Sequence, residues 1–119
     1  MKTILVIEDQ PQMRRNVCTV LEMEGFEVLT AENGRLGVAA AKEDLPDLIL
    51  CDVMMPVMDG HAFMARLRED EAHQHIPVVI TSASPQVPEG ARAHLRKPYE
   101  LHRLLDVISE HKRAQAPQP

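Results

Sequence analysis

The chain has 119 residues, which is enough for one domain with a substantial core but too few for a second domain. Its formal net charge of −5 argues against nucleic acid as a direct partner, and we find neither an apolar run long enough to span a membrane nor a signal peptide. Only 3 % of the residues are aromatic, so we expect a core of aliphatic residues and methionine.

Strand-like and helix-like segments alternate along the chain, which is typical of βα units around a parallel sheet. Strands are expected at short apolar runs bounded by turn residues, at 3–7, 26–30, 47–52, from 77 onward and at 93–96. Helices are favoured by a first-turn proline, by capping side chains or by helical apolar spacing at four places, near Pro11, Gly34, Gly60 and Leu101. The second of these helices contains two glycines and is the weakest by propensity.

The stretch between the fourth and fifth expected strands departs from this regular order. It contains Pro85, Pro88 and Gly90, which leave room for at most one helical turn before the strand at 93–96. The sequence therefore predicts a parallel α/β sheet in which the helix between these two strands is shortened or absent.

Polar side chains follow the carboxyl ends of four expected strands. In chain order they are Glu8 with Asp9, then Asp52, Ser82 and Lys97. A carboxylate at the end of a buried strand is unfavourable unless a cation or hydrogen-bond donors accompany it. Because ligands of open α/β sheets bind at the carboxyl ends of the strands, we expect these groups to converge on one site.

Three converging carboxylates repel one another, and a hard divalent cation with oxygen ligands removes that repulsion. Mg²⁺ suits such a site because it accepts one or two carboxylates, keeps water ligands and bridges to phosphate. Asp52 can then attack a phosphorus centre and form an acyl phosphate, with Lys97 neutralising charge and Ser82 donating a hydrogen bond. Each residue alone is more typical of a solvated turn; their joint occurrence in this order favours the functional interpretation.

Four motifs occur in order along the chain: Glu8-Asp9, Asp52-Val-Met-Met-Pro-Val-Met-Asp-Gly60, Pro77-Val-Val-Ile-Thr-Ser-Ala83 and Lys97-Pro98. With them the chain resembles the receiver domain of a two-component response regulator, similar to stand-alone chemotaxis regulators, over residues 2–113. The resemblance implies a flavodoxin-like, doubly wound fold with five parallel strands in the order 2-1-3-4-5, an order for which a member of this family is a standard example.

The resemblance also implies the roles of the site residues. Asp52 is the phosphoacceptor, and Lys97 pairs with the phosphoryl group. Mg²⁺ is bound directly by Asp9, Asp52 and the backbone carbonyl of Met54, whereas Glu8 acts mainly through a metal-bound water.

The switch hydroxyl has two candidates, Thr81 and Ser82. The spacing from Pro77 and the small residue Ala83 that follows favour Ser82. His94 stands where the family's switch aromatic is expected. Because the fourth helix looks reduced, the family's usual output surface does not carry over to this chain.

These features predict a stand-alone regulator that accepts a phosphoryl group from a histidine kinase or a histidine phosphotransfer protein. It would signal to an unidentified protein target through a changed surface, as a monomer or weak dimer in the cytoplasm, without membrane contact. It is not expected to be an enzyme beyond its own phosphorylation and dephosphorylation. The alternative is a phosphorylation-independent adaptor with the same fold. An aspartyl phosphatase is disfavoured because Met54 stands where such enzymes typically have a second carboxylate.

Four further expectations concern residues outside the site. Cys18 and Cys51 should be free thiols in a reducing compartment. The pair His73 and His75 should lie in a solvated connector. The segment 84–93 should be a loop that responds to phosphorylation. The domain should occupy 1–113, followed by a disordered tail at 114–119, which has nothing to bury.

Overall fold

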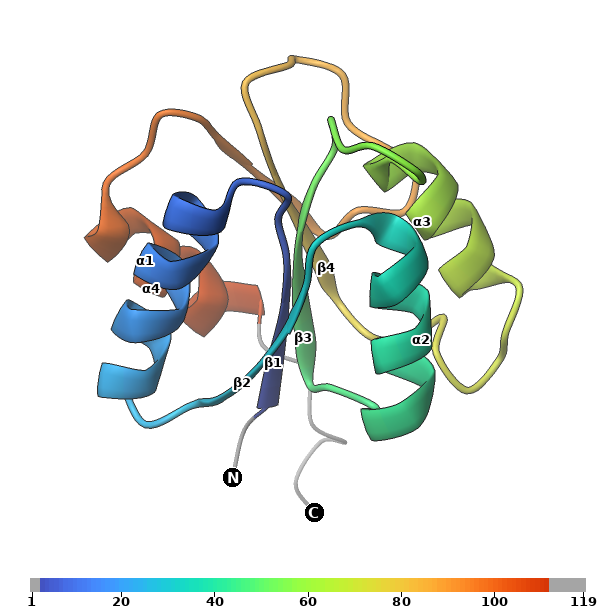
Figure 1. Cartoon of the computed structure of the whole chain (residues 1–119), viewed down its shortest axis with the longest axis horizontal. Coiled ribbons are helices and arrows are strands. Elements are labelled where there is room, and N and C mark those ends of the chain that lie inside the picture. The colour runs from blue at the N-terminus through green and yellow to red at the C-terminus, as the bar shows by residue number, and fades with distance from the viewer. Residues whose placement is uncertain (1–2, 112–119) are drawn as a thin grey trace.

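The strands of the chain form one parallel sheet with helices on both faces (Figure 1). We describe residues 3–111 in a computed structural model. The strands are β1 (Thr3–Ile7), β2 (Glu27–Ala31), β3 (Leu48–Asp52), β4 (Val78–Ser82) and β5 (Ala93–Arg96). The helices are α1 (Pro11–Met23), α2 (Gly34–Asp44), α3 (Gly60–Arg68) and α4 (Leu101–His111). The strand order is β2-β1-β3-β4-β5, which confirms the predicted fold class.

The continuous apolar runs of the central strands are explained by burial on both faces of the sheet. Leu5 and Ile7 of β1 pack into a cluster with α2 and α3, whereas Ile4 and Val6 pack into a second cluster with α1 and α4. Figure 1 shows the two helix pairs on opposite sides of the strands. A parallel strand covered on both faces has no polar side to display, so it does not alternate in hydrophobicity.

The capping residues start the helices where the sequence predicts. The Asn33 side chain accepts a hydrogen bond from the backbone N–H of Leu36, and Asp59 accepts one from Ala62, each at 2.9 Å. The second strand begins one residue later than expected, because the Phe26 N–H is bonded to the Leu21 carbonyl at the end of α1.

The two glycines of α2 allow this helix to approach the rest of the molecule closely. A Cβ on Gly37 would lie 2.5 Å from Cδ1 of Ile7, and a Cβ on Gly34 would lie 2.5 Å from the Met58 carbonyl oxygen. The residues that make α2 weak by propensity are therefore those that let it pack against β1 and the loop after β3.

The segment between β4 and β5 contains no helix, as the prolines predict; the fourth helix in chain order, α4, follows β5. This segment forms the loop at the top of Figure 1 and lies against α3. The Arg68 guanidinium donates to the Glu89 carbonyl at 3.2 Å and lies 3.5 Å from the Glu89 carboxylate. The buried side chain of Pro88 and the contact of Ala91 with the core hold the loop further.

The prediction of a solvated connector is wrong for His73. Its side chain is buried, although the neighbouring His75 is exposed. Nδ1 of His73 lies 3.0 Å from a carboxylate oxygen of Asp70. The pKa of Asp70 is lowered by a hydrogen bond from the Ala72 N–H and, less strongly, by His73. The N–H groups of His73 and Gln74 both donate to the Asp70 carbonyl, so the chain makes a tight turn after α3. Two histidines that flank a glutamine in the sequence do not indicate that one of them is buried.

Three other expectations concern the cysteines, a membrane span and the end of the domain. Cys18 and Cys51 are both free, and burial raises the pKa of the Cys51 thiol. Within residues 3–111, no helix combines the length and the apolar character needed to cross a membrane. The predicted tail at 114–119 and the domain boundary at 113 lie outside the described residues.

Candidate functional site

The sheet order places the polar strand ends next to one another. β3 lies between β1 and β4, so Asp52 at the end of β3 is flanked by the residues that follow β1 and by the end of β4. In this register Asp52 is paired with Thr81. The residues after the outer strand β5 reach the same edge, where the Lys97 N–H donates to the Ser82 carbonyl at 3.0 Å.

Lys97 joins two of the three carboxylates. Its ammonium nitrogen lies 2.9 Å from Oε1 of Glu8 and 3.1 Å from Oδ2 of Asp52. These contacts connect side chains that lie 89 and 45 residues from Lys97 along the chain. A single ammonium therefore compensates two buried acidic groups.

The oxygens of Glu8 and Asp52 are largely engaged within the protein. The second oxygen of Glu8, Oε2, accepts a hydrogen bond from the Gln10 N–H at 3.2 Å. Oδ1 of Asp52 accepts one from the Val53 N–H at 2.7 Å. Both residues are buried, with exposed fractions of 4 % and 6 %. Asp9 is only half-buried, so it is the most accessible carboxylate of the three.

Burial and charge act in opposite directions on the ionisation of the site. Burial raises the pKa of Glu8, although the hydrogen bond and charge of Lys97 oppose this effect. Burial alone would lower the pKa of Lys97, but its contacts with Glu8 and Asp52 outweigh burial and raise that pKa. Lys97 is therefore held as an ammonium at neutral pH, and a further cation would favour the ionised form of Glu8.

The three carboxylates are close enough to share a metal ion. Oxygens of Glu8, Asp9 and Asp52 all lie within 4.8 Å of one another. A group of carboxylate oxygens, one of them on a half-buried residue that water can reach, matches the ligands that Mg²⁺ prefers. The donor set therefore fits a hard divalent cation.

Both hydroxyl candidates are buried at the end of β4. Thr81 is paired with Asp52 in the sheet, whereas the Ser82 hydroxyl accepts a hydrogen bond from the Ser84 N–H at 3.1 Å. This contact connects the Ser82 hydroxyl to the loop after β4. Its role as the switch hydroxyl stays a prediction.

The remaining predicted residues lie around the site. The half-buried ring of His94 has Nε2 3.3 Å from the Ser82 carbonyl oxygen, so it stands beside the candidate switch residue. The Met54 side chain is 71 % exposed, which leaves only its backbone to take part in the site. The role of each residue stays a prediction.

Two residues that the sequence did not single out support the site. The Arg14 guanidinium, from α1, donates to the Glu8 carbonyl at 2.7 Å and so fixes the backbone that carries the acidic pair. Tyr99 packs against the cluster between the sheet and α1 and α4, and burial raises its pKa to about 12. Arg14 lies only six residues from Glu8, but no motif in the sequence marks its contact with that backbone. Tyr99 has no sequence signal either, because its burial depends on the packing of the sheet against α1 and α4.

Comparison with known proteins gives consistent matches. The model of the family described as the response regulator receiver domain matches residues 4–109. The chain is 35% identical over 116 residues to the protein PilH of Pseudomonas aeruginosa, covering 92% of this chain and 96% of PilH. It is 38% identical over 112 residues to the DNA-binding dual master transcriptional regulator RpaA of Synechocystis, covering 88% of this chain but only 46% of RpaA.

Solved structures show the same likeness. The chemotaxis protein CheY4 of Vibrio cholerae superposes with a TM-score of 0.86 at 30% sequence identity. The superposition covers 93% of this chain and 98% of CheY4. The chain thus spans nearly the whole of PilH and CheY4 but less than half of RpaA.

Proposed function

The chain belongs to the response regulator receiver domain family of two-component signalling, and on this premise we propose that it is a regulator phosphorylated on Asp52. Receiver domains are generally signalling modules rather than enzymes, and the family interacts with histidine kinases or histidine phosphotransfer proteins. The observation that carries the proposal is the placement of Lys97 between Glu8 and Asp52, two carboxylates that cluster with Asp9. This arrangement places a buried nucleophile, Asp52, next to a positive charge and next to carboxylate oxygens that could bind a metal.

The proposed reaction is phosphoryl transfer from a phosphohistidine of the partner to Asp52. A carboxylate oxygen of Asp52 forms a bond to phosphorus while the P–N bond breaks, and the imidazole takes the bonding electron pair and then a proton from solvent. The Lys97 ammonium, 3.1 Å from Oδ2, is placed to stabilise the charge on the phosphoryl oxygens. Ser82 is proposed to donate its hydroxyl hydrogen to one of those oxygens, and the chain catalyses no reaction other than its own phosphorylation and dephosphorylation.

We propose Mg²⁺ as the cofactor of this reaction. Asp9, Asp52 and the Met54 carbonyl would bind it directly, and Glu8 would bind it through water. When bound, the ion neutralises negative charge between the carboxylates and the phosphoryl group. Asp9 is suited to a direct bond because it is the most accessible of the three carboxylates.

The proposal is tested by mass measurement after incubation with acetyl phosphate and Mg²⁺. We expect the intact chain to gain the mass of one phosphoryl group and to lose this gain when EDTA removes the metal. The Asp52→Asn variant, which keeps the size of the side chain, should show no gain. Labelling of that variant would refute Asp52 as the phosphoacceptor, and labelling indifferent to EDTA would refute the requirement for Mg²⁺. No labelling of the wild type would favour a phosphorylation-independent adaptor.

We further propose that the segment 84–91 changes when Asp52 is phosphorylated. Its described amide bonds are local ones, such as Ser84 N–H to the Ser82 hydroxyl and Gln86 N–H to the Ser84 hydroxyl. If Ser82 turns toward a phosphoryl group, its bond to the Ser84 N–H is exchanged for new contacts, and the loop becomes ordered as it follows Ser82 toward the site. A loop with few backbone hydrogen bonds has low local stability and can respond in this way.

Amide hydrogen exchange tests this response. We expect fast exchange across 84–91 in the unmodified protein and slower exchange with beryllofluoride and Mg²⁺, a mimic of the phosphorylated state. The Ser82→Ala variant should bind the mimic with little change in loop exchange. Exchange that is slow from the start, or equally affected by the mimic in both proteins, would place the response elsewhere.

Family membership also supports proposals about the partners, the localisation and the oligomeric state of the protein. We propose that its phosphodonor is a histidine kinase or a histidine phosphotransfer protein, that it acts on a protein target rather than on nucleic acid, and that it works in the cytoplasm as a monomer or weak dimer. The open loop between β4 and β5 supports a target surface different from one built on a helix in that position.

A further inference from the structure

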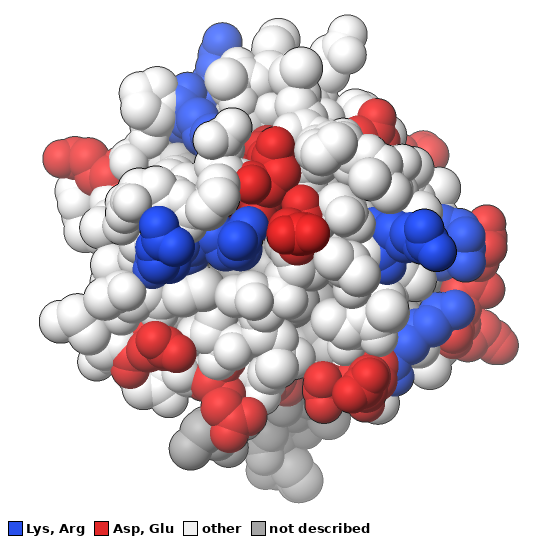
Figure 2. Space-filling view, viewed as in Figure 1, with Lys and Arg blue, Asp and Glu red and all other residues white. Residues whose placement is uncertain are grey.

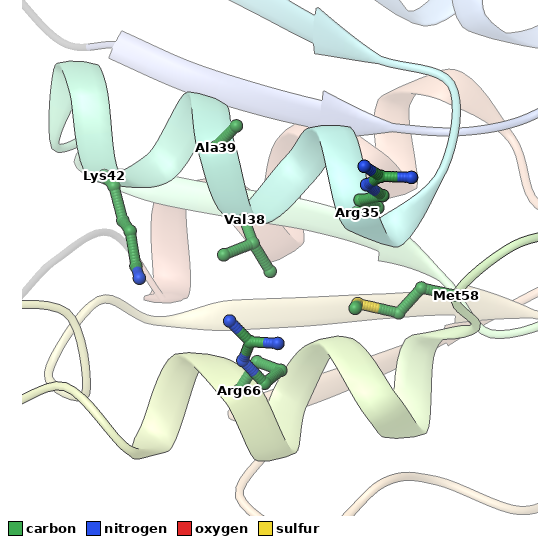
Figure 3. A pocket seen from close by; sticks show the side chains of 6 residues that line it. All are labelled: Arg35, Val38, Ala39, Lys42, Met58 and Arg66. Carbon is green, nitrogen blue, oxygen red and sulfur yellow. The ribbon is translucent and has the colours of Figure 1, made fainter.

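A groove of about 370 Å³ lies between α2 and α3, away from the carboxylate site. Its floor is apolar and is formed by Val38 and Met58, whereas the exposed Ala39 and the cations Arg35, Lys42 and Arg66 line its rims. Figure 3 shows Val38 and Arg66 pointing toward each other from the two helices, with Met58 at one end of the groove and Lys42 at the other. Figure 2 shows basic side chains on the side of the molecule where α2 and α3 lie, with acidic side chains beside them.

The cations of the groove have only weak partners among the described residues. The charge of Lys42 is the smallest of the contributions to the lowered pKa of Asp70. Among residues 3–111, neither Arg35 nor Lys42 makes an ion pair. Arg66 has one partner, Glu69, at 3.8 Å, and both side chains are more than half exposed, so the pair is weak. Three basic groups remain available in a chain whose net charge is −5.

The spacing of the cations indicates the size of the ligand. Arg35 and Lys42 are seven positions apart on α2, which is two helical turns or about 10 Å along the axis. One phosphate group does not bridge that distance, whereas an extended peptide covers about 10 Å in three residues. The groove also offers apolar surface between the charges, which suits an aliphatic side chain flanked by carboxylates.

One end of the groove is fixed by a backbone hydrogen bond between α2 and the loop after β3. The Gly34 N–H donates to the Met58 carbonyl at 3.0 Å, and the absence of a side chain on Gly34 allows this approach. Val38 is buried, so the floor is part of the core and does not depend on the ligand for its shape. A preformed site of this kind loses little conformational freedom on binding.

We propose that this groove binds an acidic peptide segment of a partner protein, in which aliphatic residues are flanked by carboxylates. The charge complementarity between three cations without strong partners and an acidic segment supplies the attraction and the orientation. The site is separate from Asp52, and the proposal does not depend on phosphorylation.

The test measures binding of a fluorescent peptide, Glu-Glu-Leu-Leu-Glu-Glu, by anisotropy at low salt. The full chain should bind it at least about tenfold more tightly than Gln-Gln-Leu-Leu-Gln-Gln, and added salt should weaken the binding. The triple variant Arg35→Gln, Lys42→Gln, Arg66→Gln should lose at least about tenfold in affinity, as should Ala39→Glu, which places a negative charge in the groove.

The matched control removes three charges elsewhere. Arg15, Arg92 and Arg103 are exposed and lie outside the groove, so their joint replacement by glutamine gives the same net charge and should leave binding within about twofold. Equal losses in the two triple variants, or no preference for the acidic peptide over the glutamine peptide, would overturn the proposal. Displacement of the peptide by ATP that binds more tightly to the same residues would assign the groove to small organic phosphates and overturn it too.

Discussion

Replacing Lys97 with methionine is expected to lower the free energy of unfolding by about 2–3 kcal/mol at neutral pH, because it leaves two buried carboxylates without their cation. The ammonium contacts Glu8 at 2.9 Å and Asp52 at 3.1 Å, and its side chain is only 21% exposed. Methionine has a similar length and packs against the same surroundings, so the loss reports mainly the charge. Urea unfolding at a series of pH values measures it.

The pH dependence of this loss has a defined sign. Burial already raises the pKa of Glu8, and removal of Lys97 raises it further, so the folded variant is penalised where Glu8 is ionised. The loss should be full at neutral pH and should shrink as the pH falls through the raised pKa of Glu8. In the wild type, the stabilisation due to the raised pKa of Lys97 is present below 10.5 and is lost only as the pH rises above that value.

Lys42 provides the matched control for this experiment. It is an exposed lysine on α2 without an ion pair among the described residues, so Lys42→Met should change stability by less than about 0.5 kcal/mol. A similar loss in both variants, or a loss in Lys97→Met that does not depend on pH, would show that Lys97 contributes packing rather than charge compensation.

The Asp9→Asn variant is expected to lose measurable Mg²⁺ binding, whereas Glu8→Gln should lose about tenfold in affinity. Asp9 is half-buried and belongs to the carboxylate cluster, and it is proposed to bind the ion directly. Both oxygens of Glu8 are occupied, one by Lys97 and one by the Gln10 N–H, so Glu8 is less free to bind the ion. Titration calorimetry near neutral pH distinguishes the two variants.

A second readout separates lost affinity from damaged folding. Ligands that bind only the folded state stabilise it, by about 2.7 kcal/mol at one hundred times the dissociation constant. Mg²⁺ should therefore raise the melting temperature of the wild type and of Asp106→Asn, a control that removes an exposed carboxylate of α4, but not that of Asp9→Asn. Equal affinity losses in Asp9→Asn and Glu8→Gln would contradict the assignment of direct and water-mediated roles.

The parallel sheet, the order of its elements along the chain and the set of residues at its carboxyl edge could all be predicted from local sequence patterns. Apolar runs covered on both faces define β1, β3 and β4, and parallel strands necessarily end at one edge. Pro85 and Pro88 removed the helix between β4 and β5 for a local reason, since proline lacks the amide hydrogen and restricts its neighbour. Such local rules need no knowledge of distant contacts.

The contacts among these residues could not be predicted in this way, because they depend on how distant segments pack. The bridge from Lys97 to Glu8 and Asp52, and the support of Glu8 by Arg14, depend on side-chain directions across several strands and a helix. The burial of His73 was missed for the same reason, because the exposure of a connector depends on what folds over it. The groove between α2 and α3 likewise forms only when the two helices pack together. The residue pattern of one helix does not indicate which charged residues of the other helix will face it.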